Sequence, residues 1–320
     1  MFKQRPQKVV LFLCLVLFCL SSAAASAEEA VRMGFQKSST LMILIKNRGS
    51  LEKALAPLGV EVQWHQFVSG MPMMEAARAG QLDVTADVAD TITPFALSSN
   101  APLTFFLQER PSPEAQALLA LNDSPVKTVA DLKGKNICLT KGAGGHYLVM
   151  AELEKAGLDY NKDVKIAYMA ATDCRAAFMT GAVAAWSAYD PFLSATMAQG
   201  VARVISDGRR AGADYHRFYL TASDYAAKRP DVLKVIFDEL KETGDWVKAN
   251  PEEAAELIAP VLGFDLETVK MLNDHRSYDI DLVDQAAVDG QQKLVDAFAL
   301  IEVLPERFNV SDKIKIWEGR

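Results

Sequence analysis

Residues 135–158 have the sequence KNICLTKGAGGHYLVMAELEKAGL, and the rest of the chain is organised around this stretch. It predicts a buried strand over residues 136–140, a glycine-rich turn, and a helix over residues 146–156 that Gly157 closes. Further strands alternate with helices on both sides of this unit. Such alternation predicts an α/β fold with a mostly parallel sheet.

The glycines of this turn also have a chemical consequence. Gly142, Gly144 and Gly145 stand where the end of a strand meets the start of a helix. Glycine lets the backbone approach a ligand closely, and the first helical N–H groups carry a partial positive charge. The turn can therefore hold an anion, although an ordinary tight turn has the same composition. It is not a nucleotide-binding loop, because the glycine spacing differs and no Lys-Ser or Lys-Thr pair follows.

The first residues predict export. Basic residues within the first eight positions precede an apolar run over residues 9–20, and small residues follow up to Ala27. This order is typical of a cleavable secretory signal peptide over residues 1–27, and its apolar part is short for a membrane span. No second apolar stretch of the sequence is long enough to cross a bilayer. We therefore expect a soluble exported protein.

Charge and cysteine content narrow the class of protein. The formal net charge is −7 and no basic run is present, which argues against nucleic acid as a partner. Past the signal peptide only Cys138 and Cys174 remain, and in an oxidising compartment they could pair. Cys138 lies in mid-strand and Cys174 opens a helix, so two separate buried thiols fit equally well. The four histidines show no metal-ligand spacing, and we expect neither a metal nor a cofactor.

The length of 320 residues allows two lobes. The polar turn at residues 122–125 predicts the boundary between them. We expect one lobe to comprise residues 28–121 and 216–320, ending in a helical segment, and the other to comprise residues 122–215.

Three strand-to-helix turns carry chemistry suited to a ligand, at residues 36–40, 85–91 and 142–146. In open α/β sheets, ligands bind beyond the carboxyl ends of the strands. The first turn has three consecutive hydroxyl residues at a helix start, each of which alone is a common N-cap. Because the first and third turns fall in different lobes, two helix N-termini could converge on a sulfonate, phosphate or carboxylate.

Several short motifs occur in a specific order. They are GFQK at 34–37, SP at 124–125 with VADLKGK at 129–135, KG at 141–142 with His146, Asp173 with RAAF at 175–178, YDPF at 189–192, and DHR at 274–276. With this order and spacing, nearly the whole exported chain resembles the periplasmic aliphatic sulfonate-binding proteins of ABC importers. That family belongs to a wider group that binds taurine, nitrate and sulfonates.

The resemblance implies a periplasmic-binding-protein type II fold, in which two α/β lobes joined by a two-crossover hinge close on a small anion. It implies a monomer in the periplasm, with ABC permease and ATPase subunits at the inner membrane as partners. A protein that presents its ligand to a membrane sensor would fit the same sequence. The residues expected to contact the ligand are Gln36, Ser38, Ser39, Asp87, Asp90, Gly144, Gly145, His146, Tyr189 and Asp190. Tyr189 is preferred over Trp186 because it lies nearest the strand end and the two side chains point to opposite faces.

The second turn departs from the family pattern. The family has a glycine- and threonine-rich segment that ends in Gly-Asp, whereas this chain has TADVADT at 85–91, one residue longer. Asp90 takes the position of the family's aspartate, and Asp87 is extra. An ionised aspartate about 4 Å from an anion would cost several kcal/mol and would gain as much beside an ammonium. If Asp87 faces the cleft, the ligand is a zwitterion such as taurine; otherwise Asp87 and Asp90 cap the turn and the next helix.

Other functions fit less well. The sequence has no Gly-x-Ser-x-Gly motif and no clustered Cys/His site, so we do not expect an enzyme. The pyrimidine-forming enzyme of thiamine synthesis shares the fold in some organisms, but it needs a cysteine-rich motif that this sequence lacks. Nitrate, a carboxylate or an amino acid remain alternative ligands.

Overall fold

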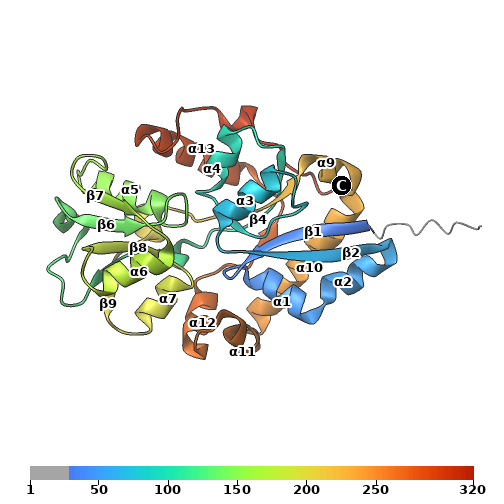
Figure 1. Cartoon of the computed structure of the whole chain (residues 1–320), viewed down its shortest axis with the longest axis horizontal. Helices are drawn as coiled ribbons and strands as arrows, with labels where there is room; N and C mark the ends of the chain where they lie inside the picture. Colours follow the sequence, from blue (N-terminus) through green and yellow to red (C-terminus); the bar gives the residue numbers. More distant parts are fainter. Residues whose placement is uncertain (1–28) are drawn as a thin grey trace, which may run out of the picture.

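Two α/β lobes lie side by side in the computed structural model, which describes residues 29–320 (Figure 1). The predicted signal peptide over residues 1–27 lies outside the described residues. The chain crosses from the first lobe to the second after β4 and returns before β10. Within the described part of the chain, no helix is both long and apolar enough to cross a membrane.

The helices and strands follow the predicted alternation. The first lobe begins with β1 (Glu29–Gln36), α1 (Thr40–Arg48), α2 (Ser50–Leu55), β2 (Val60–Phe67), α3 (Gly70–Arg78), β3 (Val88–Ala89), α4 (Thr93–Ser98) and β4 (Leu103–Glu109). The second lobe contains β5 (Gln116–Leu121), β6 (Asn136–Leu139), α5 (His146–Lys155), β7 (Lys165–Tyr168), α6 (Ala171–Met179), β8 (Ala185–Tyr189), α7 (Phe192–Met197) and β9 (Ala202–Asp207). The chain then continues through α8 (Gly208–Ala211), β10 (Arg217–Ala222), α9 (Ser223–Lys228), α10 (Pro230–Ala249), α11 (Pro251–Leu262), α12 (Leu266–Asp274), β11 (Ile280–Asp281) and α13 (Gln285–Leu300).

Residues 83–86 join the two parts of the first lobe's sheet, through backbone hydrogen bonds to Arg32 and Gly34 on one side and to Leu220 and Ala222 on the other. β1 pairs in parallel with β2, whereas β10 pairs antiparallel with β3 and β4. Val84 joins the two parts through isolated bridges to Met33 and Thr221. The predicted strand over residues 82–86 is present only as these bridges, and the Thr85 hydroxyl accepts the Leu220 N–H at 3.0 Å.

The second lobe shows how strand alternation places helices on both faces of a sheet. Its strand order is β7-β6-β8-β5-β9, and β6 runs parallel to both of its neighbours. Along β6, Ile137 and Leu139 pack in the cluster that contains α5, whereas Cys138 packs with Phe178 of α6 in a separate cluster. The period of two along the strand therefore puts α5 on one face and α6 on the other.

The predicted boundary between the lobes is wrong by one strand. The turn at residues 122–125 predicts β5 in the first lobe, but β5 pairs antiparallel with β8 and β9 of the second lobe. The first crossover therefore lies between β4 and β5. The turn at residues 122–125 is a loop at the outer edge of the second lobe, and a polar turn alone does not show on which side a strand will pair.

The C-terminal helices contact both lobes. α12 packs against α7, and α13 packs against both α4 and α5. In Figure 1, α13 and α12 lie on opposite sides of the junction between the lobes. The helical C-terminal segment therefore supports the two strand crossovers from two sides.

Cys138 of β6 and Cys174 of α6 are joined by a disulfide, with their Cα atoms 5.6 Å apart. Of the two arrangements that the sequence left open, the structure has the paired one. The bond fastens α6 to the sheet from within the second cluster of buried residues, which also contains Phe178 and Trp186. The two cysteines are 36 positions apart in the sequence.

We predict that removing this disulfide destabilises the protein by about 2–4 kcal/mol, because a loop of this length regains its entropy in the unfolded chain. Urea unfolding of the double variant Cys138→Ala/Cys174→Ala against the parent protein measures the difference. Dithiothreitol should destabilise the parent protein by a similar amount and leave the variant unchanged. A parent protein that is insensitive to reduction would contradict the prediction.

Candidate functional site

A cavity of about 120 Å³ lies between the lobes, and we call it the interlobe cavity. The first lobe, the second lobe and the second crossover all contribute to its wall. The residues that matter most for its chemistry are Gln36, Ser38, Ser69 and Asp87 from the first lobe, Lys141, Gly144 and Tyr189 from the second, and Tyr215 and Arg217 from the crossover and β10.

The first turn presents Gln36 and Ser38 to this cavity but not Ser39. Gln36 Nε2 donates to the backbone carbonyl of Asp87 at 3.0 Å, which ties the first and second turns together. The Ser39 hydroxyl accepts from the Gln36 N–H at 3.3 Å and is fully buried. Ser39 therefore shapes the turn from behind, while Gln36 and Ser38 form its surface.

The glycine-rich turn approaches its neighbours so closely that side chains would not fit. A Cβ on Gly144 would lie 2.4 Å from the Tyr215 ring, and a Cβ on Gly145, whose φ is +89°, would lie 2.3 Å from Ser187 Oγ. Gly145 also accepts a hydrogen bond from this Ser187 hydroxyl at 2.9 Å. Gly144 thus lines the cavity and Gly145 anchors the turn to β8 behind it.

His146 holds the glycine-rich turn from the inside. Its Nδ1 accepts a hydrogen bond from the Gly142 N–H at 3.1 Å, so the proton lies on Nε2, which contacts the Tyr160 hydroxyl at 3.0 Å. Burial, together with the charge of Lys141, lowers the pKa of His146 to about 3. The imidazole is therefore neutral at physiological pH. His146 is fully buried and positions the turn without reaching the cavity.

Four buried charged side chains form a cluster at the cavity, and we call them the charge quartet: Asp87 and Arg217, which line the cavity, and Glu109 and Arg276, which do not. Arg276 Nη2 contacts Asp87 Oδ2 at 3.0 Å, and its Nε donates to Glu109 Oε1 at 2.9 Å. Its Nη1 donates to the Ser38 carbonyl at 2.8 Å. Burial raises the pKa of Asp87, and the two arginines oppose this rise. The quartet therefore contains as many cationic groups as carboxyl groups.

Arg217 is the cation of the quartet that has a hydrogen-bond donor left, and among the described residues Asp87 Oδ1 is likewise without a partner. Its Nε lies 3.6 Å from Asp87 Oδ2 and its Nη1 lies 3.8 Å from Glu109 Oε1. Among the described residues, this buried Nη1 has no hydrogen-bond partner. The guanidinium stacks on the ring of Tyr215 at 4.5 Å, and Tyr215 has a left-handed φ of 55°. A strained residue thus positions an arginine at the cavity wall.

Asp190 was predicted to contact the ligand, but it does not line the interlobe cavity. Its Oδ1 accepts from the Ser194 N–H at 2.9 Å and from the Ser194 hydroxyl at 2.6 Å. Its Oδ2 lies 2.7 Å from His275 Nδ1, just beyond α12. Burial lowers the pKa of His275, but Asp190 outweighs this effect and the pKa is raised. Asp190 thus joins the second lobe to the C-terminal segment.

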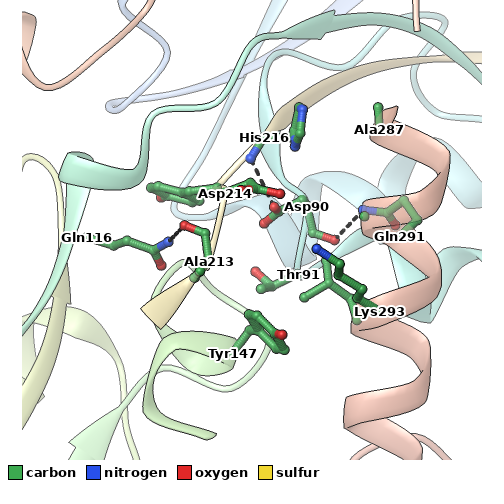
Figure 2. Close-up of a pocket in the computed structure, with 14 residues that line it drawn as sticks. Asp90, Thr91, Gln116, Tyr147, Ala213, Asp214, His216, Ala287, Gln291 and Lys293 are labelled. Atoms are coloured by element: carbon green, nitrogen blue, oxygen red, sulfur yellow. Dashed lines mark hydrogen bonds between the residues drawn. The ribbon is translucent and has the colours of Figure 1, made fainter. Parts of the chain in front are cut away.

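Asp90 lies in a different, smaller pocket of about 20 Å³ between the second crossover and α13 (Figure 2). Its Oδ2 accepts from the His216 N–H at 2.9 Å, and its carbonyl accepts from Gln291 Nε2 at 3.0 Å. Burial raises the pKa of Asp90 to about 7; the His216 N–H opposes this rise and the charge of Asp214 adds to it. Asp90 therefore links the second crossover to α13 and does not line the interlobe cavity.

The structure brings five of the predicted residues together at the cavity, namely Gln36, Ser38, Asp87, Gly144 and Tyr189. Trp186 is buried beneath the sheet, as the strand alternation indicated. Sequence reasoning missed Arg217. The available signal was a charged residue at the head of the apolar run FYLTA, which an exposed strand end also explains. Among residues 29–320, no group of His, Cys, Asp and Glu is arranged to hold a metal ion.

The two lobes, the two crossovers and a cavity lined from both sides define a periplasmic-binding-protein fold. A relative in Escherichia coli (strain K12), named for aliphatic sulfonates binding, is 33% identical over 293 residues, which is 91% of this chain and 90% of that protein. The crystal structure of the periplasmic aliphatic sulphonate binding protein SsuA from Escherichia coli matches with a TM-score of 0.82 and 32% identity, over 89% of this chain and 92% of that chain.

A second solved structure, the alkanesulfonate-binding protein SsuA from Xanthomonas axonopodis pv. citri bound to MOPS, also matches with a TM-score of 0.82. Its identity is 28%, over 89% of this chain and 97% of that chain. Residues 56–254 match the family described as NMT1/THI5 like. The chain belongs to this family and, within it, groups with the solute-binding proteins named for aliphatic sulfonates.

The position of Asp90 predicts a pH dependence of stability. A carboxyl with a folded pKa of about 7 and an unfolded pKa near 4 stabilises the folded state fully below pH ~4. This contribution is lost as the pH rises through about 7. We expect the parent protein to lose on the order of 2–3 kcal/mol between pH 5 and pH 8 relative to Asp90→Asn.

Urea unfolding at the two pH values measures this difference. Asp289→Asn is the matched control, because Asp289 is exposed on α13 and should leave the pH dependence of the parent protein unchanged. Parallel pH profiles for the parent protein and Asp90→Asn would show that Asp90 titrates normally.

Proposed function

We propose that the protein is an extracytoplasmic solute-binding protein that holds a sulfonate in the interlobe cavity and delivers it to the permease of an ABC importer. The observation that carries this proposal is that Arg217 lines the cavity while its buried Nη1 has no hydrogen-bond partner among the described residues. A buried donor of this kind is costly unless a ligand accepts its hydrogen bond. The relatives named for sulfonates support the class of ligand.

The other groups of the cavity suit the same ligand. A sulfonate offers several oxygen acceptors and carries its charge at any physiological pH. The Ser38 hydroxyl and the Gln36 amide line one side of the cavity, and the backbone of Gly144 lines the other. Lys141, beside the glycine-rich turn, adds a positive charge. Donors from both lobes therefore surround one small anion, with Arg217 as the buried cation.

Asp87 has one carboxylate oxygen bound by arginines and one without a hydrogen-bond partner among the described residues. Asp87 lines the cavity, but its Oδ2 is bound by Arg276 at 3.0 Å and lies 3.6 Å from Arg217 Nε. Its other oxygen, Oδ1, is buried without a hydrogen-bond partner among the described residues and could accept one hydrogen bond from a ligand. Asp87 is therefore compatible with a plain sulfonate and with an amino-sulfonate such as taurine.

Binding, not catalysis, is the role that we infer for this cavity. Among the described residues, its lining contains hydroxyl groups but no histidine or cysteine side chain that could act as a base or a nucleophile. His146 is neutral and lies behind the glycine-rich turn. We further propose that the protein works as a periplasmic monomer whose lobes close on the ligand about the two crossovers.

Calorimetric titration with ethanesulfonate, nitrate, acetate and glycine tests the proposal. We expect ethanesulfonate to bind most tightly, and Arg217→Gln to weaken it by about 10- to 100-fold, because a hydrogen bond to a charged group is lost. Arg210→Gln is the control, since Arg210 is exposed on α8 and does not line the cavity.

Because Arg217 belongs to a buried cluster, its variant needs a check on folding by circular dichroism and urea titration. Ser38→Ala gives a second measurement, since Ser38 is only half-buried and its side chain should be replaceable without unfolding. Tight binding of nitrate or glycine with no response to ethanesulfonate would overturn the proposed ligand class.

A further inference from the structure

The interlobe cavity has charges of both signs on its wall. Lys141 and Arg217 line it as cations, and among the described residues Asp87 is the one acidic side chain that lines it. Arg217 and Asp87 are also deeply buried, with 4% and 2% of their side-chain surfaces exposed. A plain sulfonate needs only donors, because its oxygens accept hydrogen bonds. The carboxylate therefore needs an explanation of its own.

Each of these two buried residues has one polar atom without a hydrogen-bond partner among the described residues. In Arg217 the atom is Nη1, a donor, and in Asp87 it is Oδ1, an acceptor. A buried donor and a buried acceptor both cost free energy while they remain unpaired. A ligand that pairs with both must itself bring an acceptor and a donor.

Other contacts hold the two charged groups in place. The guanidinium of Arg217 stacks on the ring of Tyr215 at 4.5 Å. Asp87 Oδ2 accepts from Arg276 Nη2 at 3.0 Å, and the Asp87 carbonyl accepts from Gln36 Nε2 at 3.0 Å. Arg217 Nε and Asp87 Oδ2 remain 3.6 Å apart, beyond hydrogen-bond distance. The two charges are thus close together without a direct hydrogen bond, and a short ligand can contact both residues.

The electrostatic surroundings of Asp87 suit an added cation. Burial raises the pKa of Asp87, and the charges of Arg276 and Arg217 oppose this rise. Glu109 adds to the rise, and the hydroxyl of Ser39 opposes it. A ligand ammonium would favour the charged carboxylate as the two arginines do. A methyl group in the place of the ammonium would leave Oδ1 desolvated and without a partner.

The size and the remaining lining of the cavity limit the ligand to a short one. Its volume of about 120 Å³ is small compared with the roughly 300–1,000 Å³ of typical ligand sites. Met71 and Ile92 give it an apolar stretch of wall that suits a short carbon spacer. The hydroxyls of Ser38 and Ser69 line the same cavity and can accept hydrogen bonds from an ammonium.

We propose that the interlobe cavity binds a short amino-sulfonate as a zwitterion, with the sulfonate at Arg217 and the ammonium at Asp87 Oδ1. This inference rests on the proposed sulfonate function and names the ligand class within it. Asp87 is then the residue that sets specificity. Arg276 is a positioning residue, because it holds Oδ2 and leaves Oδ1 for the ligand.

Calorimetric titration of the parent protein with taurine, isethionate, propanesulfonate and ethanesulfonate tests this assignment. Taurine, isethionate and propanesulfonate have nearly the same shape and differ in their terminal group, which is an ammonium, a hydroxyl or a methyl. We expect taurine to bind about 10- to 100-fold more tightly than propanesulfonate, because a hydrogen bond to a charged group is gained. Isethionate, a donor without charge, should fall between them.

The variant Asp87→Asn keeps the shape of the side chain and removes its charge. We expect it to lose most of the preference for taurine over propanesulfonate and to bind propanesulfonate within about threefold of the parent protein. Asp289→Asn is the matched control, since Asp289 is exposed on α13 and does not line the cavity. Circular dichroism and urea titration check folding. The three ligands of equal shape test the inference on the parent protein even if Asp87→Asn does not fold.

The outcomes separate the two proposals. Failure of every one of these sulfonates to bind overturns the proposed function itself. Binding of ethanesulfonate and propanesulfonate, with taurine no tighter than propanesulfonate, overturns the zwitterion site and leaves the function standing. A folded Asp87→Asn variant that keeps the full preference for taurine shows that the ammonium lies elsewhere and contradicts the role of Asp87. A loss of the preference in Asp289→Asn would contradict it as well.

Discussion

The charge quartet is the interaction on which the arrangement of the site depends. Its members come from the loop before β3, from β4, from the head of β10 and from the segment after α12. Arg276 alone contacts Asp87, Glu109 and the carbonyl of Ser38. Because isolated buried charges are costly, each of these segments can reach its place only when the others are present. Within the quartet, Arg217 Nη1 and Asp87 Oδ1 have no hydrogen-bond partner among the described residues, so a ligand in the cavity can supply one.

Much of the fold follows from local pattern in the sequence. The glycines at 142–145 and the alternation along strands such as β6 predict the strand-to-helix units, and the structure contains them. The same local rules place Gly144 and Tyr189 at the cavity and Trp186 beneath the sheet. These features depend only on neighbours within a turn or a strand, where residue type decides the conformation.

The parts that could not be predicted depend on partners far apart in the sequence. Asp87 and Arg276 are separated by 189 positions, so no spacing rule connects them, and Asp87 alone suggested a partner for an ammonium. Asp190 likewise lies at the end of a strand beside the cleft, but His275 takes its carboxylate. The lobe boundary was wrong for a related reason, since strand pairing, not the turn after β5, decides membership of a sheet.

The adjacent residues His275 and Arg276 connect the relative position of the lobes to the shape of the site. His275 contacts Asp190 of the second lobe, and Arg276, the next residue along the backbone, holds the quartet of the first lobe. A rotation of the second lobe that moves Asp190 must therefore either break its contact with His275 or pull on the segment that carries Arg276. If the contact breaks, the Asp190 carboxylate loses His275 as its partner. If the segment is pulled, the hydrogen bond from Arg276 to the Ser38 carbonyl is strained. We infer that an opening of the cleft would also loosen the anion site, a coupling that would let a protein hold its ligand when closed and release it when open.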